Sequence, residues 1–156
     1  MTPAVVMLEK AKVDHEVRAY DHDPNAESYG NEAVEALGLD PSTVFKTLLA
    51  VVDGSETVVA VVPVANRLDL KALAKTAGGK KATMADPADA ERLTGYVVGG
   101  ISPLGQRRKL RTFIDATAES LDHMHVSAGR RGLEVTLAPT ELGRLLSAAF
   151  ASIAAD

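Results

Sequence analysis

The chain contains no cysteine and no tryptophan among its 156 residues. The absence of cysteine excludes a protein thiol nucleophile, a disulfide framework and a cysteine-ligated zinc site. No apolar run approaches the roughly 20 residues that a membrane-spanning helix needs, and the first residues lack the basic start of a secretory signal. We therefore expect a cytoplasmic protein without a membrane partner.

Aromatic side chains and net positive charge are also scarce. The chain has three Phe, three Tyr and a formal net charge of −4. Extensive base stacking and bulk attraction to nucleic acid are therefore excluded, so a nucleic-acid partner would need a local basic patch. The composition, 46% hydrophobic and 24% charged, is otherwise typical of one globular domain, which we assign to residues 1–156.

Hydrophobic periodicity predicts helices that alternate with short strands. We expect helices over residues 3–12, 31–37, 70–77, 87–93 and 139–153. Eight strands are expected, over residues 15–20, 42–52, 57–64, 80–84, 96–98, 112–115, 124–127 and 133–137. This succession predicts a single domain of the α+β class, built around a mixed sheet or barrel with helices around it.

A loop with the sequence GGISPLG occupies residues 99–105. Its adjacent glycines allow positive φ and a close approach of another molecule to backbone N–H groups, while the proline and the third glycine fix the next turn. Such a loop either presents a set of hydrogen-bond donors or is simply a strand end with two tight turns. Both interpretations stay open on this pattern alone.

Lys46 is the charged residue that could complement this loop. In an extended strand it shares a face with four apolar residues, Val44, Leu48, Ala50 and Val52. A lysine among apolar neighbours extends to solvent, is paired, or meets a ligand. The spacing does not distinguish these possibilities.

Short motifs with distinctive residues are spread along the whole chain. They are TPA at 2–4, Tyr20 followed by HDP at 22–24, FKTLL at 45–49, MADP at 84–87, TGY at 94–96 leading into GGISPLGQ at 99–106, VS at 126–127 and RGL at 131–133. Together these motifs resemble the YbaK/EbsC family of bacterial aminoacyl-tRNA editing proteins. The resemblance implies a mixed, barrel-like sheet with helices packed around it.

The same resemblance implies a trans-editing deacylase that cleaves the ester of cysteine mischarged to proline tRNA. Its implied partners are that tRNA and prolyl-tRNA synthetase, and it implies neither a cofactor nor a metal. Two alternatives stay open: an Ala-tRNA(Pro) hydrolase of the same family, and a non-catalytic module that binds aminoacyl-tRNA or the synthetase. The implied catalytic residues are Lys46, Gly99, Gly100 and Ile101, and the implied substrate-binding residues are Tyr20, Tyr29, Thr47, Ser102, Pro103 and Ser127.

No protein group stands out as the one that attacks the ester. Ser102 and Ser127 lie outside a G-x-S-x-G elbow, and no H-E-x-x-H zinc motif is present. His123 and His125 could supply two metal ligands on one strand face, although solvated surface histidines are the ordinary interpretation. The resemblance implies that the substrate thiol attacks its own ester and leaves a cyclic thiolactone, while the protein positions and polarises. Glu134 carries little weight in this interpretation.

Five basic residues flank these motifs. Their positions allow contacts to acceptor-stem phosphates if they converge near the pocket mouth, and form an ordinary solvated face if they are scattered. Sequence alone favours the solvated face, whereas a tRNA substrate makes them the predicted phosphate contacts. They are Arg107, Arg108, Lys109, Arg130 and Arg131.

Overall fold

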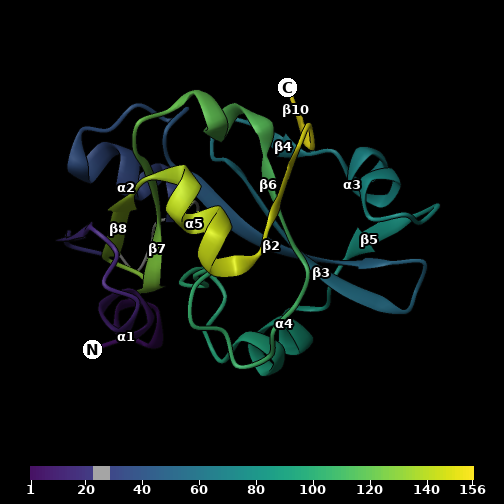
Figure 1. Ribbon diagram of the computed structural model, residues 1–156, viewed down its shortest axis with the longest axis horizontal. Helices are drawn as coiled ribbons and strands as arrows, with labels where there is room; N and C mark the ends of the chain where they lie inside the picture. The colour runs from purple at the N-terminus through teal and green to yellow at the C-terminus, as the bar shows by residue number, and fades with distance from the viewer. Residues whose placement is uncertain (23–28) are drawn as a thin grey trace.

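The computed structural model describes residues 1–22 and 29–156 (Figure 1). The helices are α1 (Pro3–Lys10), α2 (Tyr29–Leu37), α3 (Leu70–Thr76), α4 (Pro87–Thr94) and α5 (Pro139–Leu146), with a short 3-10 helix at Ala116–Ser120. The strands are β1 (His15–Ala19), β2 (Phe45–Val52), β3 (Glu56–Pro63), β4 (Arg67–Leu68), β5 (Ala82–Met84), β6 (Thr112–Asp115), β7 (Met124–Arg130), β8 (Leu133–Leu137), β9 (Ala149–Ala151) and β10 (Ala154–Ala155). Within the described residues, no helix is both long and apolar enough to cross a bilayer.

The strands of the described chain form three sheets. The largest has the order β5-β2-β3-β6-β9, a second has the order β1-β8-β7, and β10 pairs with β4. In the largest sheet β2 and β3 are antiparallel, whereas β3 and β6, and β6 and β9, are parallel. The predicted α+β class with a mixed sheet is therefore confirmed.

An isolated bridge joins the two larger sheets. Val44 pairs in parallel with His125, and the His125 N–H donates to the Thr43 carbonyl at 2.9 Å. Beyond this bridge β2 runs away from β7 toward the other side of the molecule (Figure 1). Two strands that meet at one point and then diverge leave an opening between them, and this opening contains the pocket described below.

The core packs on both faces of the β2–β3 hairpin. One apolar cluster joins Leu49 and Val59 to α1, β7, β8 and α5. The other joins Ala50 and Val58 to α3. Because β3 is covered on both faces, its central residues are almost continuously apolar, as expected for a buried strand.

Residues 96–98 are not a strand, which corrects one expectation. Tyr96 is buried, and its hydroxyl donates to the Leu104 carbonyl at 2.6 Å. Val97 is 73% exposed, and its carbonyl accepts the Gly100 N–H at 2.8 Å. The three residues form a turn that leads into the glycine loop, because no neighbouring strand pairs with them in the described structure.

The last helix is shorter than the apolar spacing predicts. It ends at Leu146, and Ser147 takes a left-handed conformation with φ of 50°. Phe150 then lies in β9, beside Ile114 of β6. Apolar spacing over a few residues fits a buried strand as well as a helix, so the pattern extended the helix too far.

Candidate active site

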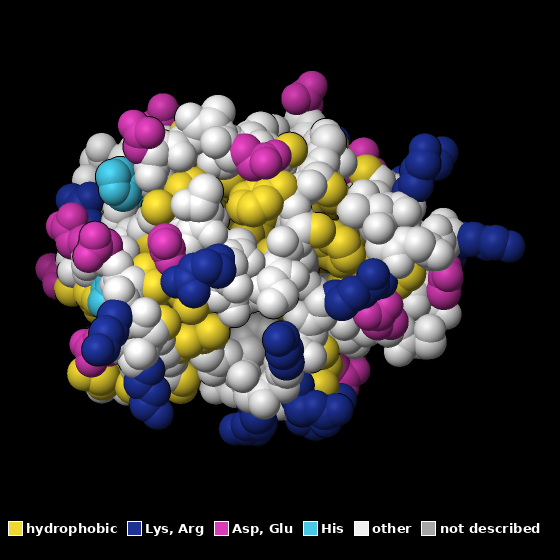
Figure 2. Space-filling model, in the orientation of Figure 1, with side chains coloured by type: hydrophobic (Ala, Val, Ile, Leu, Met, Phe, Trp, Pro, Cys, Tyr) yellow, Lys and Arg dark blue, Asp and Glu magenta, His cyan; other side chains and the backbone are white. Residues whose placement is uncertain are grey.

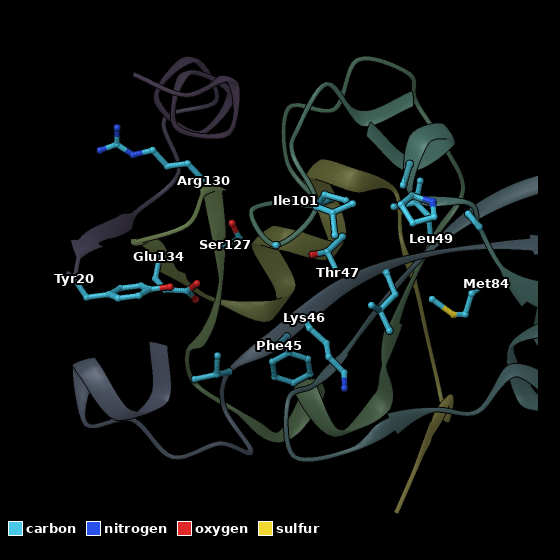
Figure 3. A pocket seen from close by; sticks show the side chains of 17 residues that line it. Tyr20, Phe45, Lys46, Thr47, Leu49, Met84, Ile101, Ser127, Arg130 and Glu134 are labelled. Atoms are coloured by element: carbon cyan, nitrogen blue, oxygen red, sulfur yellow. The ribbon is translucent and has the colours of Figure 1, made fainter. Parts of the chain in front are cut away.

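A pocket of about 400 Å³ opens between β2, β7, β8 and the turn after α4 (Figure 3). Its volume is within the range of roughly 300 to 1,000 Å³ that small-ligand sites occupy. Much of its wall is apolar, with contributions from Phe45, Leu49 and Met84. The structure brings these sequence-predicted site residues together here: Tyr20, Lys46, Thr47, Gly99, Ile101, Ser127 and Arg130.

Two predicted substrate-binding residues do not line this pocket. Ser102 is fully buried, and its Oγ accepts the Leu104 N–H at 3.2 Å. Pro103 is buried and lines a different cavity, near α1 and α5. These two predictions are corrected, because the second half of the loop turns inward to hold its own backbone. The side chain of Tyr29 lies outside the described residues.

The glycine turn leaves at most two of its three predicted backbone donors free beside the pocket. The N–H of Gly100 is already used, because it donates to the Val97 carbonyl at 2.8 Å. The N–H groups of Gly99 and Ile101 have no acceptor among the described residues. Gly99 has φ of 96°, a conformation that side-chain-bearing residues rarely adopt. The predicted oxyanion role of Gly100 is thus corrected to a turn-forming role.

The edge of β2 beside the pocket is unpaired at Thr47. On this side β5 pairs with β2 at Ala50–Val52, and the Leu49 carbonyl accepts the Ala85 N–H at 3.0 Å. Backbone groups of alternate residues in an antiparallel strand point to the same side, so those of Thr47 point as those of Leu49 do. No described strand reaches Thr47 there. The backbone N–H and C=O of Thr47 can therefore bind an acceptor and a donor of a ligand in the pocket.

Two buried oxygen atoms in the pocket lack hydrogen-bond partners among the described residues. They are Thr47 Oγ1 and Glu134 Oε2. Glu134 is only 6% exposed, and desolvation raises the pKa of its carboxyl to about 8. Unpartnered buried polar atoms are rare in folded proteins, and water, an ion or a ligand ordinarily supplies the partner. Both atoms are therefore available to a polar ligand that enters the pocket.

Glu134 is the site residue that sequence reasoning missed. In the antiparallel pair of β7 and β8, it lies directly opposite Ser127. A hairpin register placing 127 opposite 134 would have identified it, but the β-bulge between Ser127 and Arg130 makes that register hard to read from the sequence. The available signal was the short glycine-containing turn between the two predicted strands.

Tyr20 and Lys46 lie on different sides of the pocket. Tyr20 follows β1, and Figure 3 shows its ring beside Glu134. Burial raises the pKa of the Tyr20 hydroxyl, and the charge of Glu134 acts in the same direction. Lys46 is half-buried, desolvation lowers the pKa of its ammonium, and its side chain extends away from Thr47 and Ile101 (Figure 3). No described residue forms an ion pair with it.

No described residue is placed to act as an activating base for Ser127. Its Oγ accepts the Gly129 N–H at 3.1 Å. His125, two residues away, has its Nδ1 2.6 Å from Thr136 Oγ1. Glu134, across the strand pair, is mostly protonated at neutral pH because its pKa is about 8. Serine needs such a base to become a nucleophile, so the described site orients a substrate better than it attacks one.

The five predicted phosphate contacts fall in two regions. Arg130 and Arg131 line a second cavity next to the pocket, and Arg107 lies beside Gly95, one of the other residues that line this cavity. Arg108 and Lys109 instead line the cavity that contains Pro103. Figure 2 shows Lys and Arg side chains along the lower edge of the molecule, over the α1 and α4 side. The cations are therefore only partly convergent.

The sequence matches a known family over most of its length. Residues 23–145 match the family model described as the aminoacyl-tRNA editing domain. The chain belongs to this editing family. The resemblance to the YbaK/EbsC group is thus confirmed, and the family acts on mischarged aminoacyl-tRNA.

Two relatives of this chain are described as deacylases. A candidate Cys-tRNA(Pro)/Cys-tRNA(Cys) deacylase, EbsC of Enterococcus faecalis, is 38% identical over 153 residues, covering 97% of this chain and 92% of that protein. The multifunctional Ser/Thr-tRNA deacylase ProXp-y of Escherichia coli K12 is 32% identical over 104 residues, covering 64% of this chain and 62% of that protein. Both share the deacylase description but differ in the named amino acid.

Solved structures share the fold of this chain. A candidate trans-editing enzyme for prolyl tRNA synthetase has a TM-score of 0.84 at 22% identity, with 100% of this chain and 99% of that chain covered. The hypothetical protein APE2540 has a TM-score of 0.88 at 21% identity, with 99% of this chain and 100% of that chain covered. At these identities the likeness supports the fold.

Proposed function

We propose that this chain removes cysteine from mischarged proline tRNA by cleaving the aminoacyl ester, acting in trans on a product of prolyl-tRNA synthetase. One observation supports this most strongly. Among the described residues, the pocket holds two buried, unpartnered oxygens and a half-buried lysine, but no activated nucleophile. Such a site can orient and polarise an ester, and it needs an attacking group from the substrate or from water.

Glu134 supplies the negative pole of the pocket. It is the acidic residue among the described lining residues, and the α-ammonium of an aminoacyl ester is the cation it would meet. Binding that ammonium favours the ionised carboxylate and offsets the desolvation that raises its pKa to about 8. Glu134 thereby holds the amino end of the substrate, and Tyr20 closes that side of the pocket.

The ester end then lies at the glycine turn. The free N–H groups of Gly99 and Ile101 donate to the developing oxyanion, while Thr47 and Ser127 fix the orientation. The substrate sulfur forms a bond to the ester carbonyl carbon and the carbonyl–ribose oxygen bond breaks. The thiol proton passes to the departing ribose oxygen, so the products are free tRNA and a cyclic thiolactone. Lys46 contributes positive charge to the pocket.

Selectivity for cysteine follows from this chemistry. A cysteine thiol has a pKa of roughly 8.5, so a useful fraction is thiolate near neutral pH, whereas a serine hydroxyl is far less acidic. Alanine has no internal nucleophile. A mostly apolar pocket distinguishes such small side chains poorly by size, because one methylene contributes only about 1 to 3 kcal/mol. The reacting group of the substrate therefore decides which ester is cleaved.

A second candidate is hydrolysis of Ser- or Thr-charged tRNA by water. It is favoured by the description of ProXp-y, which is 32% identical to this chain over 104 residues. In that reaction the same pocket would hold a water molecule at the carbonyl. An Ala-tRNA(Pro) hydrolase would use water in the same way, and a binding module would show no turnover.

A panel of charged tRNAs tests the proposal. We expect release of tRNA from Cys-tRNA(Pro), with a thiolactone or its hydrolysed product identified by mass, and little release from Ala-, Ser-, Thr- or Pro-charged tRNA. S-methylation of the cysteinyl group should leave binding but stop cleavage, because the sulfur no longer attacks. Rapid cleavage of the methylated substrate, or preference for Ser- or Thr-tRNA, would replace the thiol mechanism by a water mechanism.

A further inference from the structure

A second cavity lies on the outer side of the glycine turn. It measures about 350 Å³ and is lined by Pro3 at the start of α1, by residues 95–97 after α4, by Gly100, and by residues 129–131 between β7 and β8. Arg130 lines both this cavity and the main pocket. One elongated ligand can therefore occupy both cavities, with Arg130 beside the segment that joins its two ends.

The charged side chains at this cavity are cationic. Arg130 and Arg131 line it, and a Cβ placed on Gly95 would lie 3.6 Å from the Arg107 guanidinium. Arg130 is exposed, and its side chain makes no ion pair or hydrogen bond with any residue that the structure describes. Figure 3 shows it extending away from the interior of the main pocket. An arginine in this position is available to an anion outside the pocket.

The floor of the cavity is made of main chain. A Cβ on Gly100 would lie 2.8 Å from Arg130 Cα, and a Cβ on Gly129 would lie 2.8 Å from Tyr96 Cε1. The two turns can pack this closely only because both positions are glycine. Backbone groups and arginine side chains are contacts that bind phosphate and sugar without reading base sequence.

We infer that this second cavity binds the phosphate and sugar of the nucleotide next to the esterified ribose of tRNA, an inference that rests on the proposed function. With the aminoacyl ester in the main pocket, the terminal ribose lies at the mouth beside Arg130. The single-stranded CCA end must continue from there, and the cationic cavity shares Arg130 with the main pocket. An acidic peptide would satisfy the arginines but would not account for a cavity that shares a residue with the ester pocket.

Val97 is a suitable position at which to introduce a negative or a positive charge, because it is 73% exposed and lines the cavity. The probe is the unacylated trinucleotide CCA, with binding to the full chain measured by titration calorimetry. We expect Val97→Asp to weaken binding roughly fivefold to tenfold and Val97→Lys to strengthen it, because a nearby unit charge acts directly on the phosphate. The matched neutral variant Val97→Asn should stay within about twofold of the original chain.

Arg130→Gln gives a second, independent measurement. Loss of one phosphate contact to a single strand should reduce the salt slope of CCA binding by about 0.7. Lys71→Gln, on the exposed side of α3 and on the opposite side of the molecule from α1, removes the same charge and should leave the slope unchanged (Figure 1). Equal slopes for the Arg130 variant and the original chain would overturn the inference.

The outcomes separate this inference from the proposed function. If the affinity for CCA depends on the charge at position 97 but Cys-tRNA(Pro) is not deacylated, the nucleotide assignment of the second cavity is supported and the proposed deacylase function is overturned. If the chain deacylates Cys-tRNA(Pro) but its affinity for CCA does not change with the charge at position 97, the proposed function stands and the assignment of the second cavity is overturned. Displacement of CCA by an acidic peptide at equal concentration also overturns the assignment to a nucleotide.

Discussion

At the scale of single residues, the motifs indicated which side chains belong to the pocket better than they indicated what each one does. Lys46, Thr47 and Ser127 all line one cavity, although they come from two strands in different sheets. Ser102 and Gly100 belong to the loop motif, but both form hydrogen bonds within the loop and its turn. Sequence shows that a loop has special backbone geometry, but it does not show which of its N–H groups the fold already occupies.

Glu134 shows the opposite error. A single acidic residue in a strand looks like a solvent-facing position, and its partner across the strand pair depends on a bulge that the sequence does not reveal. In the proposed function it holds the amino end of the substrate, because it is the buried acid opposite Ser127.

The Lys46 ammonium should matter to activity and not to folding. Lys46→Met keeps the apolar stem and removes the charge. Because that ammonium is partly desolvated and unpaired among the described residues, we expect no loss of thermal stability. We expect kcat/KM for Cys-tRNA(Pro) to fall roughly a hundredfold, the usual effect of losing one electrostatic contact in an active site. The matched control is Lys75→Met on α3, and full activity of the Lys46 variant would remove this residue from the mechanism.

At the scale of elements, long periodic segments were predictable and short ones were not. The hairpin of β2 and β3, and the helices α1, α3 and α4, follow from alternation, capping residues and proline at helix starts. β4, β9 and β10 are two or three residues long. Such strands are set by what they pair with, and pairing between distant segments is not visible in local sequence.

The end of α5 can be tested by substitution at Ser147, which has φ of 50°. Ser147→Gly should stabilise the chain by about 0.5 to 1 kcal/mol, because glycine adopts the left-handed conformation without steric cost. If the helix instead continued through residue 153, as the apolar spacing predicts, the same substitution would destabilise the chain by about 0.5 kcal/mol, because glycine has a lower helix propensity than serine. The sign of the change in the free energy of unfolding, measured with denaturant, distinguishes the two.

At the scale of the whole molecule, the site lies where two sheets join and then diverge. The bridge between Val44 and His125 holds the sheets together at one point, and the hydrophobic cluster around Leu49 closes the base. This arrangement places polar groups from several segments around an apolar cavity without requiring any of them to be close in sequence. The consequence is that an acidic side chain is held in a poorly solvated position before any ligand is bound.

That buried acid should make the stability of the whole chain depend on pH. The pKa of Glu134 is raised from 4.5 to about 8, so between these values the folded chain holds a proton that the unfolded chain has released. Stability therefore falls as pH rises through this window. Glu134→Gln resembles the protonated acid and removes the effect. We expect the free energy of unfolding of the variant, relative to that of the original chain, to increase by about 3 kcal/mol between pH 5 and pH 8.

The measurement is the free energy of unfolding in urea for both chains at several pH values. Glu119→Gln, at an exposed position, makes the same change in net charge and should give a curve parallel to that of the original chain. An aminoacyl analogue with an α-ammonium should narrow the difference between the Glu134 variant and the original chain at pH 8, because the ammonium stabilises the ionised carboxylate that the variant lacks. Parallel curves for the Glu134 variant and the original chain would show that this carboxyl has an ordinary pKa, and the desolvated acid would then be removed from the account of the pocket.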